Sequence, residues 1–588
     1  MKLTPARTKL LHTAEVADGG SPHIAQGAGP SRLQRLAGSP ILGVAAAPAA
    51  AALLTLIFVI PTLAPGVLSW DTAEFQTVGP VLGTAHPTGY PAYVILGWLA
   101  SMVLQPFGDP AFRMNLLQAL LAATAVAATV ALVQVLTGRR LVALAIGLVL
   151  ASTQLFWRLS TQADPHMFHV ALVAILFTIL VVWDQRRHSK NAVVVARADR
   201  WLVAASVVFG VAVANHSLAL LLPPAIGLYI LAVDPRIIFR WRTIAACLGV
   251  LAITIIGLFL ELPIRAAMHA PLVYAHPDTL SGFQYVVLGE QFRGSLSDPF
   301  GDLFTKMGHV LDLLTSWVGP LAIAAAIGIV TSLVRRPRYL LLSGISLVAT
   351  CVFAASYANA DIERYYLVPL LIVLTWAALG AADLISLAAW AIDELRERFQ
   401  VGATATEVAA TGAPAVVVQT RRKGVWTPWL ILAGEVVVAA ALVFPVIGVI
   451  PQRQQPATAS NPGGVSQAAK NGDAAWLKVI LAPADKGGLP KDSVIVTWWS
   501  TSTTLWYGQR VLGMRPDIYI VDDRTRLDDN LGSVQDVFNK FLGNRPVFVI
   551  RLDGGSDGMD ALNTQFTIQP YVLGDGSKIN QVVGRKGS

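Results

Sequence analysis

Two short motifs that follow the first hydrophobic segment decide how this chain is interpreted: it reads WDTAEF over residues 70–75 and HPTGYP over residues 86–91. The first motif carries two acids three residues apart, Asp71 and Glu74, and the second opens with His86. Because an apolar segment precedes them, both motifs are expected at a membrane surface, where a carboxylate is costly to hold without a function. Chemistry on a substrate whose lipid tail lies in the bilayer is one such function.

The composition is that of a polytopic membrane protein. Of 588 residues, 54% are hydrophobic and only 14% are charged, whereas about 25% are charged in typical soluble domains. The net charge of +8 therefore indicates basic cytoplasmic loops and no nucleic-acid partner. Both cysteines, Cys247 and Cys351, fall inside apolar segments, which argues against a disulfide framework.

Apolar segments and basic clusters together predict about eleven membrane crossings. The segments expected to cross are 41–63, 113–136, 141–157, 166–183, 201–214, 216–233, 243–262, 311–334, 339–356, 365–391 and 426–450. The basic clusters lie in the N-terminal tail and at 139–140, 186–190, 236–242, 335–338 and 421–423. All of them face the cytoplasm only if the short apolar segment 89–105 lies in the outer interface and does not cross. The amino terminus is then cytoplasmic and the carboxyl terminus extracytoplasmic.

Three parts follow from this topology: a disordered cytoplasmic tail (1–40), a membrane domain (41–450) and an extracytoplasmic domain (451–588). Within the membrane domain we expect a first outer loop at 64–112, a long outer loop at 263–310 and a cytoplasmic linker at 393–425. In the last part, short apolar runs alternate with helical patterns, which predicts a small α/β domain with a parallel sheet.

The predicted outer side collects most of the unusual polar residues of the membrane domain. They are Asp71, Glu74, His86, Arg158, Asp164, His166, Asn215, His216, Arg265 and the run 361–364. Helix ends always carry some polar residues, which explains single members of this set. The mixture of carboxylates, histidines and arginines on one side is better explained by an outward-facing active site.

The order of the motifs resembles the bacterial protein O-mannosyltransferase-like family of the GT-C superfamily of membrane glycosyltransferases. After the two opening motifs come FWRLSTQADPHMF, ANHSLALLLPP, FLELPIRA, DTLSGFQYVVLGEQF, DIERYYLVP and, near the carboxyl end, TLWYGQRVLGMRPDIYIVDD. One departure concerns residues 164–166, which read Asp-Pro-His where a Glu-Val-Tyr-type triplet is expected.

The resemblance implies a GT-C-like polytopic α-helical membrane protein, here with a small C-terminal α/β domain, in a bacterial plasma membrane. It implies transfer of a sugar, mannose by analogy, from a polyprenyl-phosphate donor to an acceptor hydroxyl at the outer face, with inversion. The acceptor is a protein, a lipid or a glycan. A lipid or glycan flippase is the alternative function for such a polytopic chain.

An acceptor hydroxyl needs a general base, and Asp71 is predicted to be that base. Glu74 would orient the acceptor, tune Asp71, or share with it a divalent cation, Mg²⁺ or Mn²⁺. A structural alternative is a capping box, with Asp71 as the N-cap of a helix and Glu74 at its third position.

The departing phosphate needs cationic or hydrogen-bonding groups where negative charge builds up. Arg364 is the first candidate, and Arg265 and His86 are the next. Tyr90, Arg158 and Asp164 complete the set of residues predicted to bind the donor phosphate or the substrate.

Overall fold

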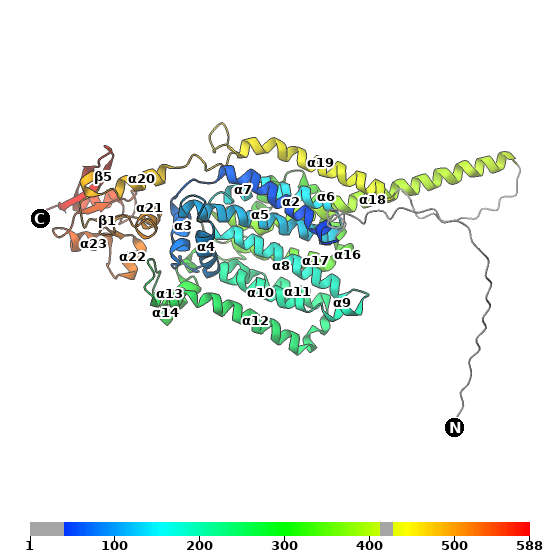
Figure 1. The fold of residues 1–588 in the computed structure, drawn as a ribbon, viewed down its shortest axis with the longest axis horizontal. Coiled ribbons are helices and arrows are strands. Elements are labelled where there is room, and N and C mark those ends of the chain that lie inside the picture. Colours follow the sequence, from blue (N-terminus) through cyan, green and yellow to red (C-terminus); the bar gives the residue numbers. More distant parts are fainter. Residues whose placement is uncertain (1–39, 412–426, 588) are drawn as a thin grey trace, which may run out of the picture. The chain divides into compact units, whose positions relative to one another are not determined.

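The computed structural model describes residues 40–411 and 427–587. The predicted tail therefore lies outside the described residues except for Pro40, where the first helix begins. Residues from Ala47 onward belong to one compact unit, which consists of a bundle of apolar helices and a small α/β domain (Figure 1).

The bundle is built from α-helices of very different lengths. They are α2 (Pro40–Val59), α3 (Trp70–Val81), α4 (Pro91–Val103), α5 (Pro110–Thr137), α6 (Arg140–Ser152), α7 (Gln154–Leu159), α8 (Pro165–Arg187), α9 (Ala192–Ala196), α10 (Arg200–Asn215), α11 (Pro223–Val233), α12 (Trp241–Phe259), α13 (Glu261–Ala267), α14 (Leu280–Val287), α15 (Leu303–Val318), α16 (Leu321–Arg335), α17 (Pro337–Ala355), α18 (Leu367–Thr411) and α19 (Thr427–Arg453). Two 3₁₀ turns near the site are η2 (Ser217–Leu221) and η5 (Ile362–Tyr366).

The chain is an integral membrane protein by the length and composition of these helices. In the described part, seven helices are long and apolar enough to cross a bilayer, or up to eight if the bent pair α15–α16 is one span. Helices α4, α6 and α11 are apolar but shorter. The number of crossings and the interfacial position of α4 stay predictions.

The crossing predicted at 311–334 is a bent helix pair, because α15 and α16 meet at 114°. Gly319 joins them with a φ of +54°, which favours glycine, and Pro320 follows. Proline cannot donate the backbone hydrogen bond that would continue α15.

The cytoplasmic linker predicted at 393–425 is helical in its first part, since α18 continues as a helix to Thr411. The rest of that segment lies outside the described residues.

The C-terminal domain is a five-stranded mixed sheet in the order β2-β1-β3-β5-β4. Its strands are β1 (Val494–Val496), β2 (Tyr519–Val521), β3 (Val547–Val549), β4 (Phe566–Val572) and β5 (Lys578–Arg585). Its helices are α20 (Gly472–Ile480), α21 (Trp499–Trp506), α22 (Asp523–Asp528), α23 (Val534–Phe541) and α24 (Met559–Gln565). Strands β1, β2 and β3 are parallel as expected, and the antiparallel hairpin β4–β5 adds the mixed edge.

The basic clusters and the predicted site residues lie at opposite ends of the bundle. Helix α8 begins beside Asp164 and ends at Arg187, so these two residues mark the two ends. Ion pairs between different helices gather at the second end: Arg187 with Asp234, Arg139 with Glu435, Arg336 with Asp383 and Arg338 with Asp184. At the first end, α3 packs against α21 of the C-terminal domain, as Figure 1 shows.

Candidate active site

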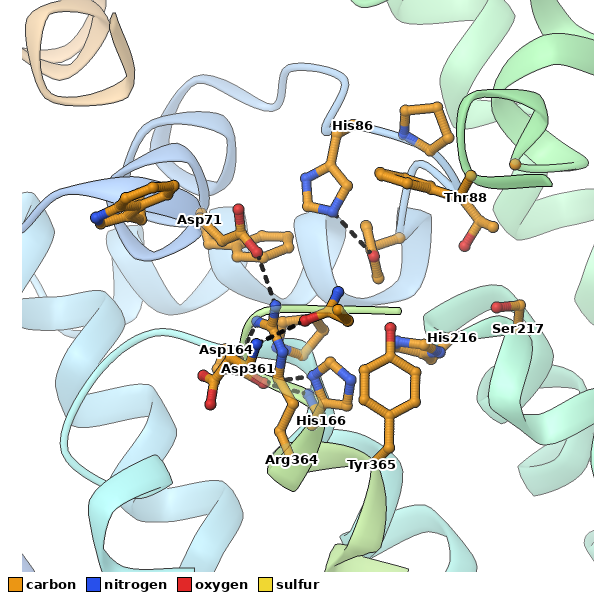
Figure 2. A pocket seen from close by; sticks show the side chains of 18 of the residues that line it. Asp71, His86, Thr88, Asp164, His166, His216, Ser217, Asp361, Arg364 and Tyr365 are labelled. Carbon is orange, nitrogen blue, oxygen red and sulfur yellow. Dashed lines mark hydrogen bonds and ion pairs between the residues drawn. The ribbon is translucent and has the colours of Figure 1, made fainter. Parts of the chain in front are cut away.

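A cavity of about 930 Å³ lies where α3 and the start of α8 meet η5 and the C-terminal domain. The residues that line it and enter the following argument are Asp71, His86, Tyr90, Asp164, His166, His216, Arg293, Asp361, Arg364, Tyr365, Lys470 and Trp499. Figure 2 shows side chains from several distant segments converging on this space. Because membrane-domain and C-terminal residues both contribute, the cavity depends on how the two parts pack.

Arg364 connects two acids at the centre of the cavity. Its Nη2 donates to Asp71 Oδ2 at 3.1 Å, and its Nη1 donates to Asp164 Oδ2 at 3.2 Å (Figure 2). The guanidinium side chain is only 11% exposed, so its pairing with two acids offsets much of the cost of burying its charge. Within the described residues its Nε has no hydrogen-bond partner. An anionic ligand group would therefore find an unused donor here.

Asp71 is held from a second side by the C-terminal domain. The indole Nε1 of Trp499 donates to Asp71 Oδ1 at 2.9 Å. Burial alone would raise the pKa of Asp71, but the charges of His86 and Arg364, with the hydrogen bonds from Trp499 and Arg364, lower the pKa below its ordinary value. Asp71 is therefore ionised at neutral pH and able to accept a proton.

Glu74 faces away from the cavity and holds His86 from behind. It is fully buried; Oε1 accepts from the His86 backbone N–H at 2.7 Å, and Oε2 contacts His86 Nδ1. On the other side of the ring, His86 Nε2 lies 3.1 Å from the hydroxyl of Tyr90. Burial lowers the pKa of His86, but Glu74 and then Asp71 outweigh it, so the pKa is raised. Glu74 thus holds His86, whose charge lowers the pKa of Asp71; of its predicted roles, this contact is compatible with tuning Asp71, and the catalytic role stays a prediction.

The capping-box alternative does not fit the start of α3. The N-cap residue is Ser69, which makes no side-chain capping bond, and Asp71 lies inside the first turn. The carboxylate of Glu74 is occupied by His86. The two acids therefore have partners outside α3: His86 for Glu74, and Arg364 and Trp499 for Asp71.

Two arginines predicted to bind phosphate lie outside the cavity lining. Arg265 donates to the carbonyl oxygens of Val81 and Leu82 at 3.1 and 2.8 Å, so it stabilises the carboxyl end of α3. Arg158 donates to Asp361 at 3.2 Å and to Glu363 at 3.1 Å, which places it behind η5. The positions of Arg265 and Arg158 therefore do not support direct contact with a phosphate. Arg364, His86, Tyr90 and Asp164 line the cavity, and of these Arg364 is the cation.

Trp499, His166 and His216 line the cavity but were not among the predicted site residues. His166 and His216 stand in motifs that carry the family resemblance, ADPHMF and ANHS, so a signal was present. Trp499 sits in the C-terminal domain, 428 residues from its partner Asp71, and no local pattern in the sequence connects the two.

The cation site predicted at Asp71 and Glu74 is not formed by the described residues. They contain no group of three or more His, Cys, Asp or Glu side chains arranged to hold a metal ion. Asp71 contacts Arg364 and Trp499, whereas Glu74 contacts His86. These two carboxylates do not form a shared site with a third ligand, so the fit for Mg²⁺ or Mn²⁺ is poor.

Comparison with known proteins supports the resemblance. The family model "Protein O-mannosyl-transferase TMEM260 N-terminal domain" matches residues 71–236. Protein O-mannosyl-transferase TMEM260 of Mus musculus is 29% identical over 394 residues, which are 63% of this chain and 52% of the mouse protein. The chain thus spans about half the length of this curated relative.

Solved structures with the same fold include ArnT from Cupriavidus metallidurans. Its crystal structure bound to undecaprenyl phosphate has a TM-score of 0.52 and 15% sequence identity, with 92% of this chain and 98% of ArnT covered. Its apo structure gives a TM-score of 0.52 and 16% identity, with the same shares of the two chains covered. The chain therefore has the fold of GT-C membrane glycosyltransferases, and its sequence resembles the protein O-mannosyltransferase family, as the motifs predicted.

Proposed function

We propose that this chain is a membrane glycosyltransferase that moves a sugar from a polyprenyl-phosphate donor to an acceptor hydroxyl, with mannose as the sugar and a protein as the acceptor. The observation that carries the proposal is the position of Asp71, an ionised carboxylate in a cavity where Arg364 supplies a cation. The family match to a protein O-mannosyl-transferase supports the sugar and the acceptor.

Asp71 acts as the general base in this reaction. Each oxygen of an ionised carboxylate accepts more than one hydrogen bond, so the bonds from Arg364 and Trp499 leave lone pairs for the acceptor hydroxyl. The acceptor oxygen attacks the anomeric carbon while its proton passes to Asp71. The bond between the anomeric carbon and the phosphate oxygen breaks, and polyprenyl phosphate leaves with the electron pair. One displacement gives inversion.

Arg364 stabilises the phosphate as negative charge builds up on it. A guanidinium that already lies in a site closed off from bulk water does not have to reorganise during the reaction, which makes it effective. Arg293 and Lys470 also line the cavity and supply further positive charge at its exposed side.

An apolar groove next to the cavity suits the lipid tail of the donor. It measures about 570 Å³ and is lined by side chains of α12, α14, η2 and the segments that flank them. Thr88, Ser217, Leu220, Val287 and Leu288 line both the groove and the cavity. A phosphate near Arg364 and a prenyl chain in the groove can therefore belong to one molecule. ArnT, which shares this fold, has been crystallised with undecaprenyl phosphate, a ligand of the proposed donor class.

The test is sugar transfer from polyprenyl-phospho-mannose to a serine- and threonine-containing peptide by the full chain in lipid. Asp71→Asn keeps the size of the side chain but removes the base, so transfer should fall by about 10²- to 10⁴-fold. Asp485→Asn, at an exposed acid away from the cavity, should leave transfer unchanged. Full transfer by Asp71→Asn would contradict the mechanism. If the unchanged chain transfers no sugar, and Asp71→Asn instead loses the export of a lipid, the flippase is favoured.

A further inference from the structure

Two histidines that line the cavity each leave one ring nitrogen unused. His166 and His216 are 4% and 3% exposed, and their ring centroids are 4.5 Å apart. In the part of the chain that the structure describes, neither Nε2 atom has a hydrogen-bond partner. Buried polar atoms are nearly always paired, so these two nitrogens point to a ligand group that would pair them.

The hydrogen bonds of His166 fix the character of its Nε2. Its Nδ1 lies 2.8 Å from Asp164 Oδ1, and an ionised carboxylate only accepts hydrogen bonds. Nδ1 therefore carries a proton, and in the neutral form of the ring Nε2 carries a lone pair. Asp164 is held ionised, because His166 and Arg364 outweigh burial and lower its pKa.

His216 has the opposite character. Its Nδ1 accepts the backbone N–H of Leu218 at 3.1 Å, so this nitrogen carries the lone pair. The proton of the ring is then on Nε2, which is a hydrogen-bond donor. Inside one cavity, the chain thus presents an unused acceptor on His166 and an unused donor on His216.

We propose that His166 and His216 together bind one hydroxyl group of the transferred sugar, an inference that rests on the proposed function. A hydroxyl donates one hydrogen bond and accepts others, so it can donate to His166 Nε2 and accept from His216 Nε2–H. A protonated amine only donates hydrogen bonds, and a carboxylate only accepts them. Neither group therefore matches both the acceptor nitrogen of His166 and the donor nitrogen of His216. The ligand group is therefore a neutral hydroxyl.

The surroundings of the pair also suit a sugar ring. The ring of Tyr365 lies 5.0 Å from His166 and that of Tyr90 lies 5.4 Å from His216, as centroid distances. Aromatic rings give apolar surface for the C–H groups of a sugar, and Figure 2 shows His166, His216 and Tyr365 close together in the cavity. By contrast, both nitrogens of His86 already have protein partners, Glu74 and Tyr90, so His86 does not need this ligand group.

The pair also gives a role to the sequence departure at residues 164–166. There, Asp-Pro-His replaces the expected Glu-Val-Tyr-type triplet. Asp164 orients His166 and also accepts a hydrogen bond from Arg364. The triplet therefore couples the sugar-binding histidine to the arginine assigned to the phosphate, and it is a specificity determinant of the site.

The test is equilibrium binding of polyprenyl-phospho-mannose and of each of its monodeoxy analogues to the full chain in lipid nanodiscs. The unchanged chain should bind one monodeoxy analogue about 10- to 100-fold more weakly than the parent lipid, because two buried partners lose their hydrogen bonds. His216→Asn keeps an acceptor for the Leu218 N–H but loses Nε2–H, and His166→Phe keeps the ring shape. Both variants should bind that analogue and the parent within about 2-fold of each other.

His169 provides the matched control. Its ring lies 6.0 Å from that of His216, but it does not line the cavity, so His169→Phe should keep the full discrimination. The inference would be overturned if both His216→Asn and His166→Phe still bound the monodeoxy analogue more weakly than the parent lipid. It would also be overturned if the unchanged chain bound every analogue equally well. A different result would contradict the proposed function alone: the chain binds the parent lipid more tightly than the analogue but transfers no sugar to any acceptor.

Discussion

Asp71 and Glu74 lie one turn apart on α3, yet the structure gives them different partners. Asp71 faces the cavity and contacts Arg364 and Trp499, whereas Glu74 is buried behind His86. Residues separated by three positions share a helix face, so the sequence alone predicts that both acids reach one space. The length of the side chains and the fold of the 82–90 loop decide otherwise, because His86 comes between Glu74 and the cavity.

The contact between Glu74 and His86 predicts a pH-dependent stability. Folding raises the pKa of His86 above its unfolded value of 6.5. The stabilisation by the contact between Glu74 and His86 is therefore complete below pH 6.5 and is lost as the pH rises through the folded-state pKa. Glu74→Gln should cost about 3–5 kcal/mol at about pH 6 and less at about pH 9. Thermal unfolding of both chains in detergent at the two pH values measures this. A cost that does not change with pH would contradict the assignment.

Arg364 is predicted to be irreplaceable by lysine. A lysine keeps the charge but has one nitrogen, which cannot donate to Asp71 and Asp164 in the fixed geometry of a guanidinium. Arg364→Lys should lower transfer by about 10²-fold or more. The matched control is Arg158→Lys, at an arginine that is 32% exposed and outside the cavity, where exposed pairs contribute only about 0–1 kcal/mol. Equal losses in the two variants would argue against a special role for Arg364.

At the scale of elements, α16 and α18 pack closely against each other, and this contact depends on two glycines. A Cβ at Gly328 would lie 1.9 Å from the Trp376 carbonyl oxygen, and one at Gly380 would lie 2.1 Å from that of Ala324. Small residues at such crossings let membrane helices approach closely. The contact joins α16 to the interior of α18, the helix that begins at Leu367 directly after η5 and Arg364.

This contact gives a prediction with its own control. Gly328→Ala should destabilise the folded chain by about 1–3 kcal/mol, because the added methyl group overlaps backbone atoms of α18. Gly344→Ala, on α17 with no atom within 4 Å of the added Cβ, should be neutral or slightly stabilising, since alanine favours helix. Thermal unfolding in detergent measures both. A Gly328→Ala chain as stable as the unchanged one would show that α16 and α18 can separate without cost.

The limits of prediction from sequence are clearest among the elements. Apolar length and basic clusters were enough to place the long apolar helices of the bundle, because bilayer thickness fixes the length of a crossing, but not short helices such as α3, α9, α13 and α14. The bend between α15 and α16 was missed, although Gly319 and Pro320 mark it, because a hydropathy average does not register two residues. The β4–β5 hairpin was missed since its strands are half exposed and carry weak alternation.

At the scale of the whole molecule, the separation of basic clusters from the cavity predicts the orientation in the membrane. Basic loops favour the cytoplasm, so the cavity and the C-terminal domain should face outward. In a Cys247→Ala, Cys351→Ala chain, a cysteine at the exposed Lys491 should react with an impermeant maleimide added to intact cells. A cysteine at the exposed Lys190 should react only after the membrane is opened. The reverse pattern would overturn the orientation.

The candidate site was predictable only in part, because its residues come from segments that are far apart in the sequence, from Leu68 to Trp499. Asp71, His86, Asp164 and Arg364 could be chosen as rare polar residues in an apolar chain. Trp499 could not, because it reaches Asp71 only through the packing of the C-terminal domain on α3. Arg265 was predicted to bind phosphate because of its charge, but its guanidinium donates to backbone carbonyl oxygens at the end of α3.

The central claim is that one cavity holds a polyprenyl-phosphate donor beside Asp71, and an electron cryomicroscopy structure of the full chain with polyprenyl phosphate tests it most directly. We expect a phosphate oxygen at about 3 Å from the Arg364 guanidinium, with the first prenyl units in the groove lined by α12 and α14. Lipid bound only at the opposite end of the bundle, among the basic clusters, with the cavity unoccupied, would contradict the claim.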